Sequence, residues 1–244
     1  MKHIALFLFV AFSAMNITSD ISAQTICENG FAGEYACDGY DLYTYFPLSS
    51  VGGGDNGNDC WGWVDSESGR EFVLFGRSDG MSVVEITDPL APSFIANLPT
   101  ATYPSLWRDI KVIGDYAFIG SEAGMHGMQI LDLTQVLDLS GFPFNITATS
   151  NYLGFGNAHN LAANPETNYV YGVGTNTFGG GLHIVDVSNP EAPFLAGSYD
   201  GAYSHDVQPV IYNGLDADYQ GQEIVFCFNG QNGLAIVNAE DKSD

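Results

Sequence analysis

The sequence predicts an all-β protein, a β-propeller built from four-stranded blades. The main observation is a nearly continuous apolar stretch that occurs four times. Its copies are Gly80 to Pro89, Gly127 to Thr134, Gly181 to Pro190 and Gly233 to Ala239. Their first glycines are 47, 54 and 52 residues apart (127−80, 181−127 and 233−181). Repeats of about fifty residues that contain short strands are typical of propeller blades.

Composition supports the same fold class. The chain has 244 residues, of which 29 are glycine, 45% are hydrophobic and only 14% are charged. Strands and tight turns use glycine, whereas exposed helices would need more Lys, Glu and Arg. This length is enough to bury a core within one all-β domain.

Each repeat divides into short apolar segments that we predict to be strands. They are 60–64, 71–75, 81–86 and 93–98 in the first repeat (58–105), 107–113, 116–119, 128–133 and 147–153 in the second (106–157), 158–163, 169–173, 182–187 and 194–199 in the third (158–203), and 205–211, 223–228 and 234–237 in the fourth (204–244). The third strand of every repeat is a nearly continuous apolar run, which suits burial on both faces between neighbouring blades.

The fourth repeat lacks a fourth strand. One explanation is that Tyr40 to Leu48, in the N-terminal leader 24–57, forms this strand and closes a four-bladed ring. The other is that the chain is the front part of a larger propeller. An open ring would leave an exposed strand edge and an uncovered blade face.

Residues 1–23 have the pattern of a secretory signal peptide. Lys2 precedes an apolar run at 4–14, and Ile21-Ser22-Ala23 offers a small-residue cleavage site. We therefore expect a secreted or cell-surface protein. No later stretch is long enough to span a membrane, so we expect no transmembrane segment in the mature chain.

Export makes disulfides possible. Cys27 and Cys37 bracket a short glycine-rich loop and are the best candidate pair. Cys60 and Cys227 fall within predicted strands, and we expect them to be buried free thiols.

The net charge of −23 limits the partners. It would repel nucleic acid and an anionic membrane surface. An acidic surface fits solubility in an external medium, or cation binding.

A second repeated feature lies at the start of each repeat's first strand. It is the set of pairs Asn58-Asp59, Arg108-Asp109, His159-Asn160 and His205-Asp206. Their second members are 50, 51 and 46 residues apart (109−59, 160−109 and 206−160). Because the first strand of a blade lines the central channel, these pairs predict a ring near one channel mouth. Neighbouring residues of a strand point to opposite faces, so we expect at most one of each pair to face the axis.

Three interpretations of this ring remain open. Oxygens of Asp59, Asp109, Asn160 and Asp206 could bind calcium or magnesium. Alternatively, His159 or His205 could act as a general base beside a metal-bound water. The third interpretation, which we favour, is that the side chains hydrogen-bond neighbouring blades.

Two further sets of polar residues stand out. Asp216, Asp218 and Glu223 lie at short spacing around a glycine turn and form a second calcium candidate, although the loop does not match an EF-hand. The alternative interpretation of this loop is a solvated turn. At the end of each third strand lie residues that we interpret as turn residues: Glu85, Asp132, Asp186 and Asn238.

The runs 181–193 (Gly-Leu-His-Ile-Val-Asp-Val-Ser-Asn-Pro-Glu-Ala-Pro) and 80–92 resemble the LVIVD repeats of bacterial surface proteins. The cysteine leader, the segment Asn58 to Trp63 and the segment Asp218 to Glu223 together resemble the choice-of-anchor B family. That resemblance implies an exported propeller whose biochemical activity is not established. Members usually run on to further repeats and an anchoring signal, so we expect this chain to be part of a larger propeller.

We therefore predict an exported binding module for an extracellular protein or a glycan, with a calcium or magnesium ion as a candidate cofactor. One alternative is a metal-assisted hydrolase or lyase that acts at the channel mouth. The other is a purely structural surface protein.

Overall fold

The computed structural model describes residues 24–141 and 143–242. The chain divides at Thr44 into two compact units, and each is described by itself. The predicted signal peptide, residues 1–23, lies outside the described residues.

The described part of the N-terminal unit is a small disulfide-linked loop. Strands β1 (Phe31–Ala32) and β2 (Tyr35–Ala36) form a short antiparallel hairpin. Cys27 and Cys37 form the predicted disulfide.

The predicted strand from Tyr40 to Leu48 was wrong. Leu42 makes only an isolated bridge with Thr25, with backbone bonds of 2.7 and 3.0 Å. Pro47, which has no N–H to donate, precedes a short 3-10 helix, η1 (Leu48–Ser50). The segment therefore has no ladder with which to complete another sheet.

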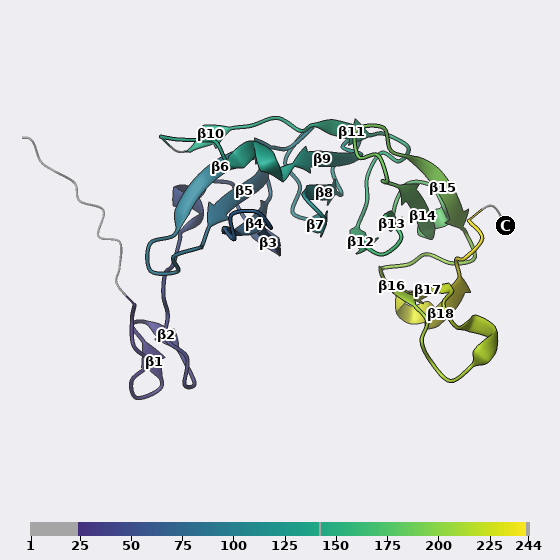
Figure 1. The fold of residues 1–244 in the computed structure, drawn as a ribbon, viewed down its shortest axis with the longest axis horizontal. Coiled ribbons are helices and arrows are strands. Elements are labelled where there is room, and N and C mark those ends of the chain that lie inside the picture. Colours follow the sequence, from purple (N-terminus) through teal and green to yellow (C-terminus); the bar gives the residue numbers. More distant parts are fainter. Residues whose placement is uncertain (1–23, 142, 243–244) are drawn as a thin grey trace, which may run out of the picture. The chain divides into compact units, whose positions relative to one another are not determined.

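The second unit contains four antiparallel sheets that follow one another along the chain (Figure 1). The first sheet has β3 (Gly57–Val64), β4 (Glu71–Arg77), β5 (Gly80–Glu85) and β6 (Ser93–Pro99). The second has β7 (Arg108–Ile113), β8 (Tyr116–Ser121), β9 (Met128–Asp132) and β11 (Ser150–Tyr152). The third has β12 (Asn160–Asn164), β13 (Tyr169–Val173), β14 (Leu182–Asp186) and β15 (Phe194–Tyr199). The fourth has β16 (Asp206–Ile211), β17 (Glu223–Phe228) and β18 (Leu234–Asn238).

These sheets are propeller blades, as predicted, and each strand predicted within the repeats is present. One unpredicted strand, β10 (Phe144–Asn145), leaves the second repeat and pairs in parallel with β6 of the first blade. Short 3-10 helices occupy several turns: η2 (Leu133–Val136), η3 (Phe178–Gly180), η4 (Ala217–Tyr219) and η5 (Gly230–Asn232).

Three apolar core clusters lie between successive blades. The first joins residues such as Leu74 of the first blade to Ile110 of the second. The second joins Phe118 to Val185, and the third includes Leu182. The third strands β5, β9 and β14 are almost fully buried, so the prediction of burial on both faces is confirmed for these three blades.

Cys227 is a buried free thiol, as expected, and burial raises its pKa to about 11. Cys60 is also free but exposed, so its predicted burial was wrong. The reason is that Cys60, Gly62 and Val64 share a face of the edge strand β3 that remains exposed. Within 24–141 and 143–242 the structure has no helix with the length and apolar character needed to cross a membrane.

Candidate functional site

The first strands of the four blades position the candidate site. Strand β3 contacts β7, β7 contacts β12, and β12 contacts β16. Two cavities lie along these strands, with volumes of about 300 Å³ and 540 Å³. They share the residues Asp59, Asp109 and Asn160, so we treat them as one continuous surface, of mixed polar and apolar character, that we call the first-strand cavity.

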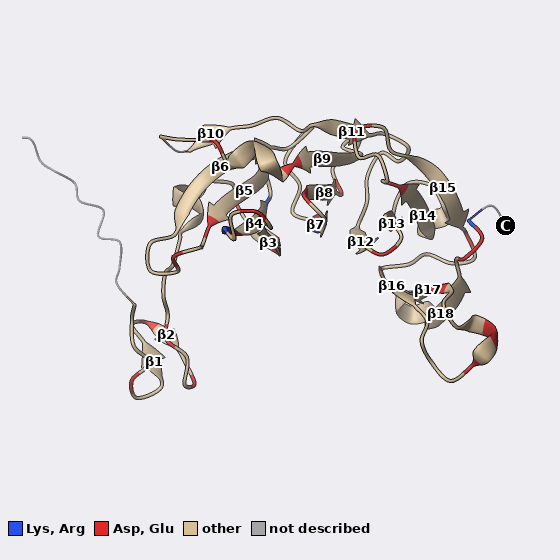
Figure 2. Cartoon of the chain, in the orientation of Figure 1, with Lys and Arg blue, Asp and Glu red and all other residues tan. Residues whose placement is uncertain are grey.

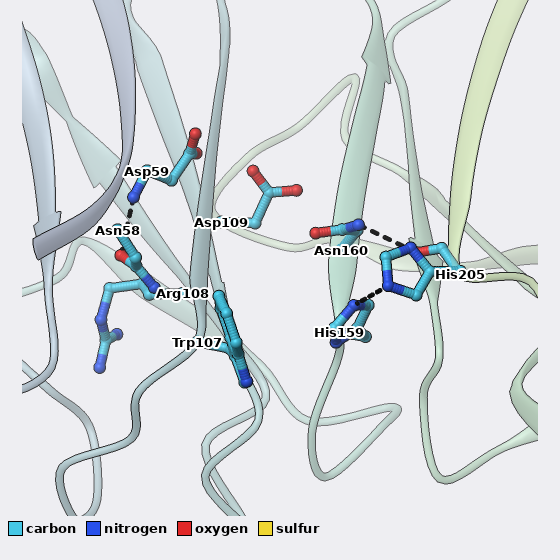
Figure 3. Close-up of a pocket in the computed structure, with 8 residues that line it drawn as sticks. All are labelled: Asn58, Asp59, Trp107, Arg108, Asp109, His159, Asn160 and His205. Carbon is cyan, nitrogen blue, oxygen red and sulfur yellow. Dashed lines mark hydrogen bonds between the residues drawn. The ribbon is translucent and has the colours of Figure 1, made fainter.

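Both members of three of the repeated pairs line the smaller cavity (Figure 3). The expectation that at most one of each pair faces the axis was therefore wrong for Asn58-Asp59 and His159-Asn160, whereas the Arg108 guanidinium points away from the histidines. Strand alternation does not apply to His159 and His205, because β12 begins at Asn160 and β16 begins at Asp206. In β3, the register shifts between Gly57 and Cys60, which frees the Asn58-Asp59 pair from the same rule.

Three ring residues hydrogen-bond the next blade, which confirms the favoured interpretation for them. The Ile110 N–H donates to the Asp59 carboxylate at 2.7 Å, and the Leu161 N–H donates to the Asp109 carboxylate at 2.6 Å. The Asn160 amide donates to the His205 carbonyl at 2.9 Å. These bonds connect the side chain of one blade to a backbone group of the next. In the fourth blade, Asp206 accepts only from the N–H of the next residue, Val207, at 2.8 Å.

Asp59 and Asp109 form a carboxylate pair with Lys111. The Lys111 ammonium contacts the Asp109 carboxylate directly and lies 3.9 Å from that of Asp59. Burial raises the pKa of Asp109 to about 7, and the neighbouring Asp59 acts in the same direction against the opposing effect of Lys111. Asp109 can therefore exchange a proton near neutral pH.

A chain of hydrogen bonds connects three blades at the cavity rim. The Glu122 carboxylate lies 2.5 Å from Nδ1 of His159, and Nε2 of His159 lies 2.8 Å from Nε2 of His205. The backbone fixes both histidines, because the His159 N–H donates to Val173 and the His205 N–H donates to Phe228, each at 2.9 Å. The sequence predicted the histidines but gave no signal for Glu122, which lies in the turn after β8.

Two tryptophans that the sequence analysis did not single out flank the cavity. Trp107 lines the smaller part and is 49% exposed, and its ring meets that of His159 edge-on at 6.4 Å. Trp61 lines the larger part, is 40% exposed, and has the Lys111 ammonium 4.9 Å from its ring centre. Trp61 and Lys111 each lie two residues after a ring aspartate, so the two-residue strand period would have placed them on the same face.

The Arg108 guanidinium points away from the two histidines (Figure 3). It donates to the Arg77 carbonyl and to Thr100, and it lies 3.0 Å from Nε2 of His126. Burial lowers the pKa of Arg108 to about 10 and that of His126 to about 4. This buried group therefore supports the blade interior.

The second calcium candidate is not assembled in the structure. Asp216 and Asp218 are exposed, and the Asp216 side chain accepts from the Asp218 N–H at 3.1 Å as the cap of η4. Glu223 is buried and accepts from Lys242 at 2.8 Å. Burial favours a higher pKa for Glu223, but the hydrogen bonds from Lys242 and its other partners outweigh burial and lower it.

Across the described ranges, no group of three or more His, Cys, Asp or Glu side chains is placed to hold a metal ion. The calcium or magnesium prediction for the ring and for the 216–223 loop stays a prediction. The interpretation of Asp132, Asp186 and Asn238 as turn residues is confirmed. Each accepts a hydrogen bond from the backbone N–H two residues later, at 2.8 to 3.0 Å.

Negatively charged residues greatly outnumber positively charged ones. Acidic residues occur in turns and strands of all four blades, whereas basic residues are few (Figure 2). Lys111 therefore contributes one of the few positive charges of the whole sequence, which has six Lys and Arg against 29 Asp and Glu. A surface with such an excess of negative charge favours ligands that are neutral or cationic.

The chain matches the LVIVD repeat family at residues 107–133 and 156–201. This confirms the LVIVD part of the resemblance. No match is found among curated proteins.

Two solved structures are similar. One is the periplasmic gluconolactonase PpgL of Pseudomonas aeruginosa, which is 11% identical over 72% of this chain and 55% of that one, with a TM-score of 0.41. The other is the extracellular domain of a one-component system of B. thetaiotaomicron, which is 14% identical over 79% of this chain and 33% of that one, with a TM-score of 0.34. The chain thus spans about half the length of the first structure and a third of the second.

Proposed function

We propose that the protein is an exported binding module that holds a neutral or amino-sugar glycan in the first-strand cavity. The observation that carries this proposal is the combination of two half-exposed tryptophans, Trp61 and Trp107, with amide and carboxylate groups on one concave surface. Ligand sites of this kind are concave, with aromatic walls and a few placed polar groups.

The chemistry of this surface fits a sugar. The face of a pyranose ring carries C–H groups with partial positive charge, which pack against the negative face of an aromatic ring. Sugar hydroxyls can donate to the Asp59 carboxylate and accept from the amide of Asn58. The surplus of 29 acidic over six basic residues argues against uronic-acid or sulfated glycans.

Export and a surface location belong to the same proposal. They rest on the signal-peptide pattern of residues 1–23 and on the resemblance to the choice-of-anchor B family. The LVIVD match at 107–133 and 156–201 agrees with them.

A glycan array followed by calorimetric titration of the bound oligosaccharide tests the proposal. We expect Trp107→Ala to weaken binding by about tenfold, the loss of roughly 1.4 kcal/mol of aromatic contact. Phe194→Ala is the matched control, because Phe194 is a 58% exposed aromatic residue on β15 and does not line the cavity. Binding that is absent from the array, or equal losses in the two variants, would refute the proposal.

Hydrolysis at the same surface is a second candidate. The observation in its favour is that the pKa of Asp109 lies at about 7, where a carboxyl group can serve as general acid or base. A screen of esters and glycosides decides the matter. Turnover by the wild type that Asp109→Asn abolishes would support hydrolysis, and no turnover with or without added metal would exclude it.

A further inference from the structure

The two histidines at the cavity rim present their ring nitrogens to one another. Nε2 of His159 and Nε2 of His205 are 2.8 Å apart, and both side chains line the smaller part of the first-strand cavity. We propose that His159 and His205 are the two protein ligands of a divalent transition metal, with Cu²⁺ or Ni²⁺ preferred. This site differs from the predicted calcium positions because its donors are imidazole nitrogens, which suit Cu, Ni and Zn.

A neighbouring carboxylate determines which ring nitrogen of His159 carries the proton. The Glu122 carboxylate lies 2.5 Å from Nδ1 of His159 and so holds the proton on that nitrogen. Nε2 of His159 then accepts the hydrogen bond from Nε2 of His205, and a metal ion that binds both nitrogens displaces the proton between them. A carboxylate that orients a ligating histidine from behind is a common feature of metal sites, because it fixes the tautomer and the ring orientation.

The other described histidines are buried and do not line the first-strand cavity. His126 has Nδ1 bonded to the Gly127 carbonyl and Nε2 to Arg108. His183 has Nε2 bonded to Tyr152 and Nδ1 to Thr177. Both rings are buried, whereas His205 is exposed and His159 is half-buried.

The separation of the two nitrogens indicates the class of metal. An ion at about 2.0–2.1 Å from both would have an N–metal–N angle of roughly 85°. That angle suits the square or tetragonal coordination of Cu²⁺ and Ni²⁺, and it is too small for tetrahedral Zn²⁺. The remaining coordination positions would be open to the cavity, where water or a ligand oxygen can complete them.

The backbone supports a preformed site. Each histidine directly precedes a first strand, and its N–H is bonded to the neighbouring second strand of the same blade. The Asn160 amide bonds the His205 carbonyl across the blade boundary. Ligands held by rigid strands lose little conformational freedom on binding.

Calorimetric titration of the purified, untagged protein with Cu²⁺ and with Ni²⁺, in a large excess of Ca²⁺, tests the proposal. The protein used is the chain without the predicted signal peptide 1–23, which also removes His3 as a competing ligand. We expect one ion per chain, lost in His159→Ala and in His205→Ala, and bound about tenfold more weakly by Glu122→Gln. The double variant Asp216→Asn/Asp218→Asn is the matched control for binding to acidic surface and should keep full affinity.

Electron paramagnetic resonance of the Cu²⁺ complex gives a second, direct measurement on the otherwise native protein. Hyperfine structure from two imidazole nitrogens is expected. Unchanged binding in the His159→Ala/His205→Ala double variant, no binding by the parent protein, or a spectrum without nitrogen coupling would overturn the proposal. Metal binding is measured here without any glycan, so this test succeeds or fails independently of the proposed function.

Discussion

The third strands of the third and fourth blades have nearly the same sequence and opposite burial. Strand β14 reads Leu-His-Ile-Val-Asp, and β18 reads Leu-Ala-Ile-Val-Asn. Leu182 and Ile184 of β14 are 0% and 3% exposed, whereas Leu234 and Ile236 of β18 are 55% and 63% exposed. The repeat pattern therefore places apolar side chains on both faces of the third strand. Whether those side chains are buried depends on the blade that packs against each face.

The packing explains this difference. In β14, Val185 faces the core shared with the second blade, while Leu182 and Ile184 face the core shared with the fourth. In β18, only the alternate residues Ala235 and Val237 pack against the third blade. Burying one Leu or Ile side chain contributes about 1.5–3 kcal/mol, so the two strands contribute very different amounts to stability.

The largest expected effect comes from truncating the matched leucines. Leu182→Ala should lower the free energy of unfolding by about 2–5 kcal/mol, because it removes buried contacts and leaves a cavity. Leu234→Ala should change it by about 0.5 kcal/mol or less, because Leu234 is exposed. Denaturant unfolding of the two variants measures both values, and similar losses would show that neighbouring blades do not control the contribution of this strand.

The second expected effect concerns a charged contact between blades. Asp109 has a pKa of about 7 when folded, chiefly because of burial, against an ordinary value of 3.8. The folded protein thus binds this proton more tightly than the unfolded chain, so the free energy of unfolding should fall as pH rises from about 4 to about 7. The slope should reach about 1.4 kcal/mol per pH unit.

Asp109→Asn tests this assignment, because an amide does not titrate in this range. Chemical denaturation at a series of pH values should show a flatter profile for Asp109→Asn than for the wild type. An unchanged slope in the variant would mean that other groups cause the pH dependence. The hydrogen bond from the Leu161 N–H to the Asp109 carboxylate would then contribute the same free energy of unfolding at every pH.

The strands of the repeats could be predicted from the sequence because their signals are local. Apolar runs and turn residues placed them within a few residues of their observed ends. Exposure was not predictable in the same way, since Leu182 and Leu234 occupy equivalent positions in the repeat. Strand β14 is paired on both sides and Leu182 packs against the fourth blade, whereas β18 is an edge strand among the described residues. Tyr40 to Leu48 alternates like a strand, but Pro47 and the 3-10 turn after it end any such ladder.

The site could be predicted only in part. The spacing of Asp59, Asp109, His159 and His205 predicted that they lie near one another, and all four line the smaller cavity. Glu122 could not be found, because a turn after β8 carries it to a histidine 37 residues later in the chain. The hydrogen bonds of the ring carboxylates to the next blade also depend on the packing of whole sheets, which no short motif specifies.

The smallest expected effect tests where this dependence on neighbours stops. Asp186 and Asn238 end β14 and β18, and each side chain accepts from the backbone N–H two residues later, at 2.8 and 3.0 Å. These bonds are local, so Asp186→Ala and Asn238→Ala should each cost about 0.5–1.5 kcal/mol whether or not another blade covers the strand.

Asn238 also donates to the Gln222 side chain at 2.7 Å, and Gln222 in turn donates to the Asp218 carbonyl at 2.9 Å. The cost of Gln222→Ala therefore sets an upper limit on the contribution of the Asn238–Gln222 bond. Thermal unfolding of the three variants then compares the two turns directly. Equal costs would mean that turn chemistry acts within the repeat, while burial acts between repeats. A much smaller loss of unfolding free energy for Asn238→Ala would mean that the turn also depends on packing of the adjacent strand. The end of an exposed strand would then be only partly formed, so the turn hydrogen bond would stabilise little.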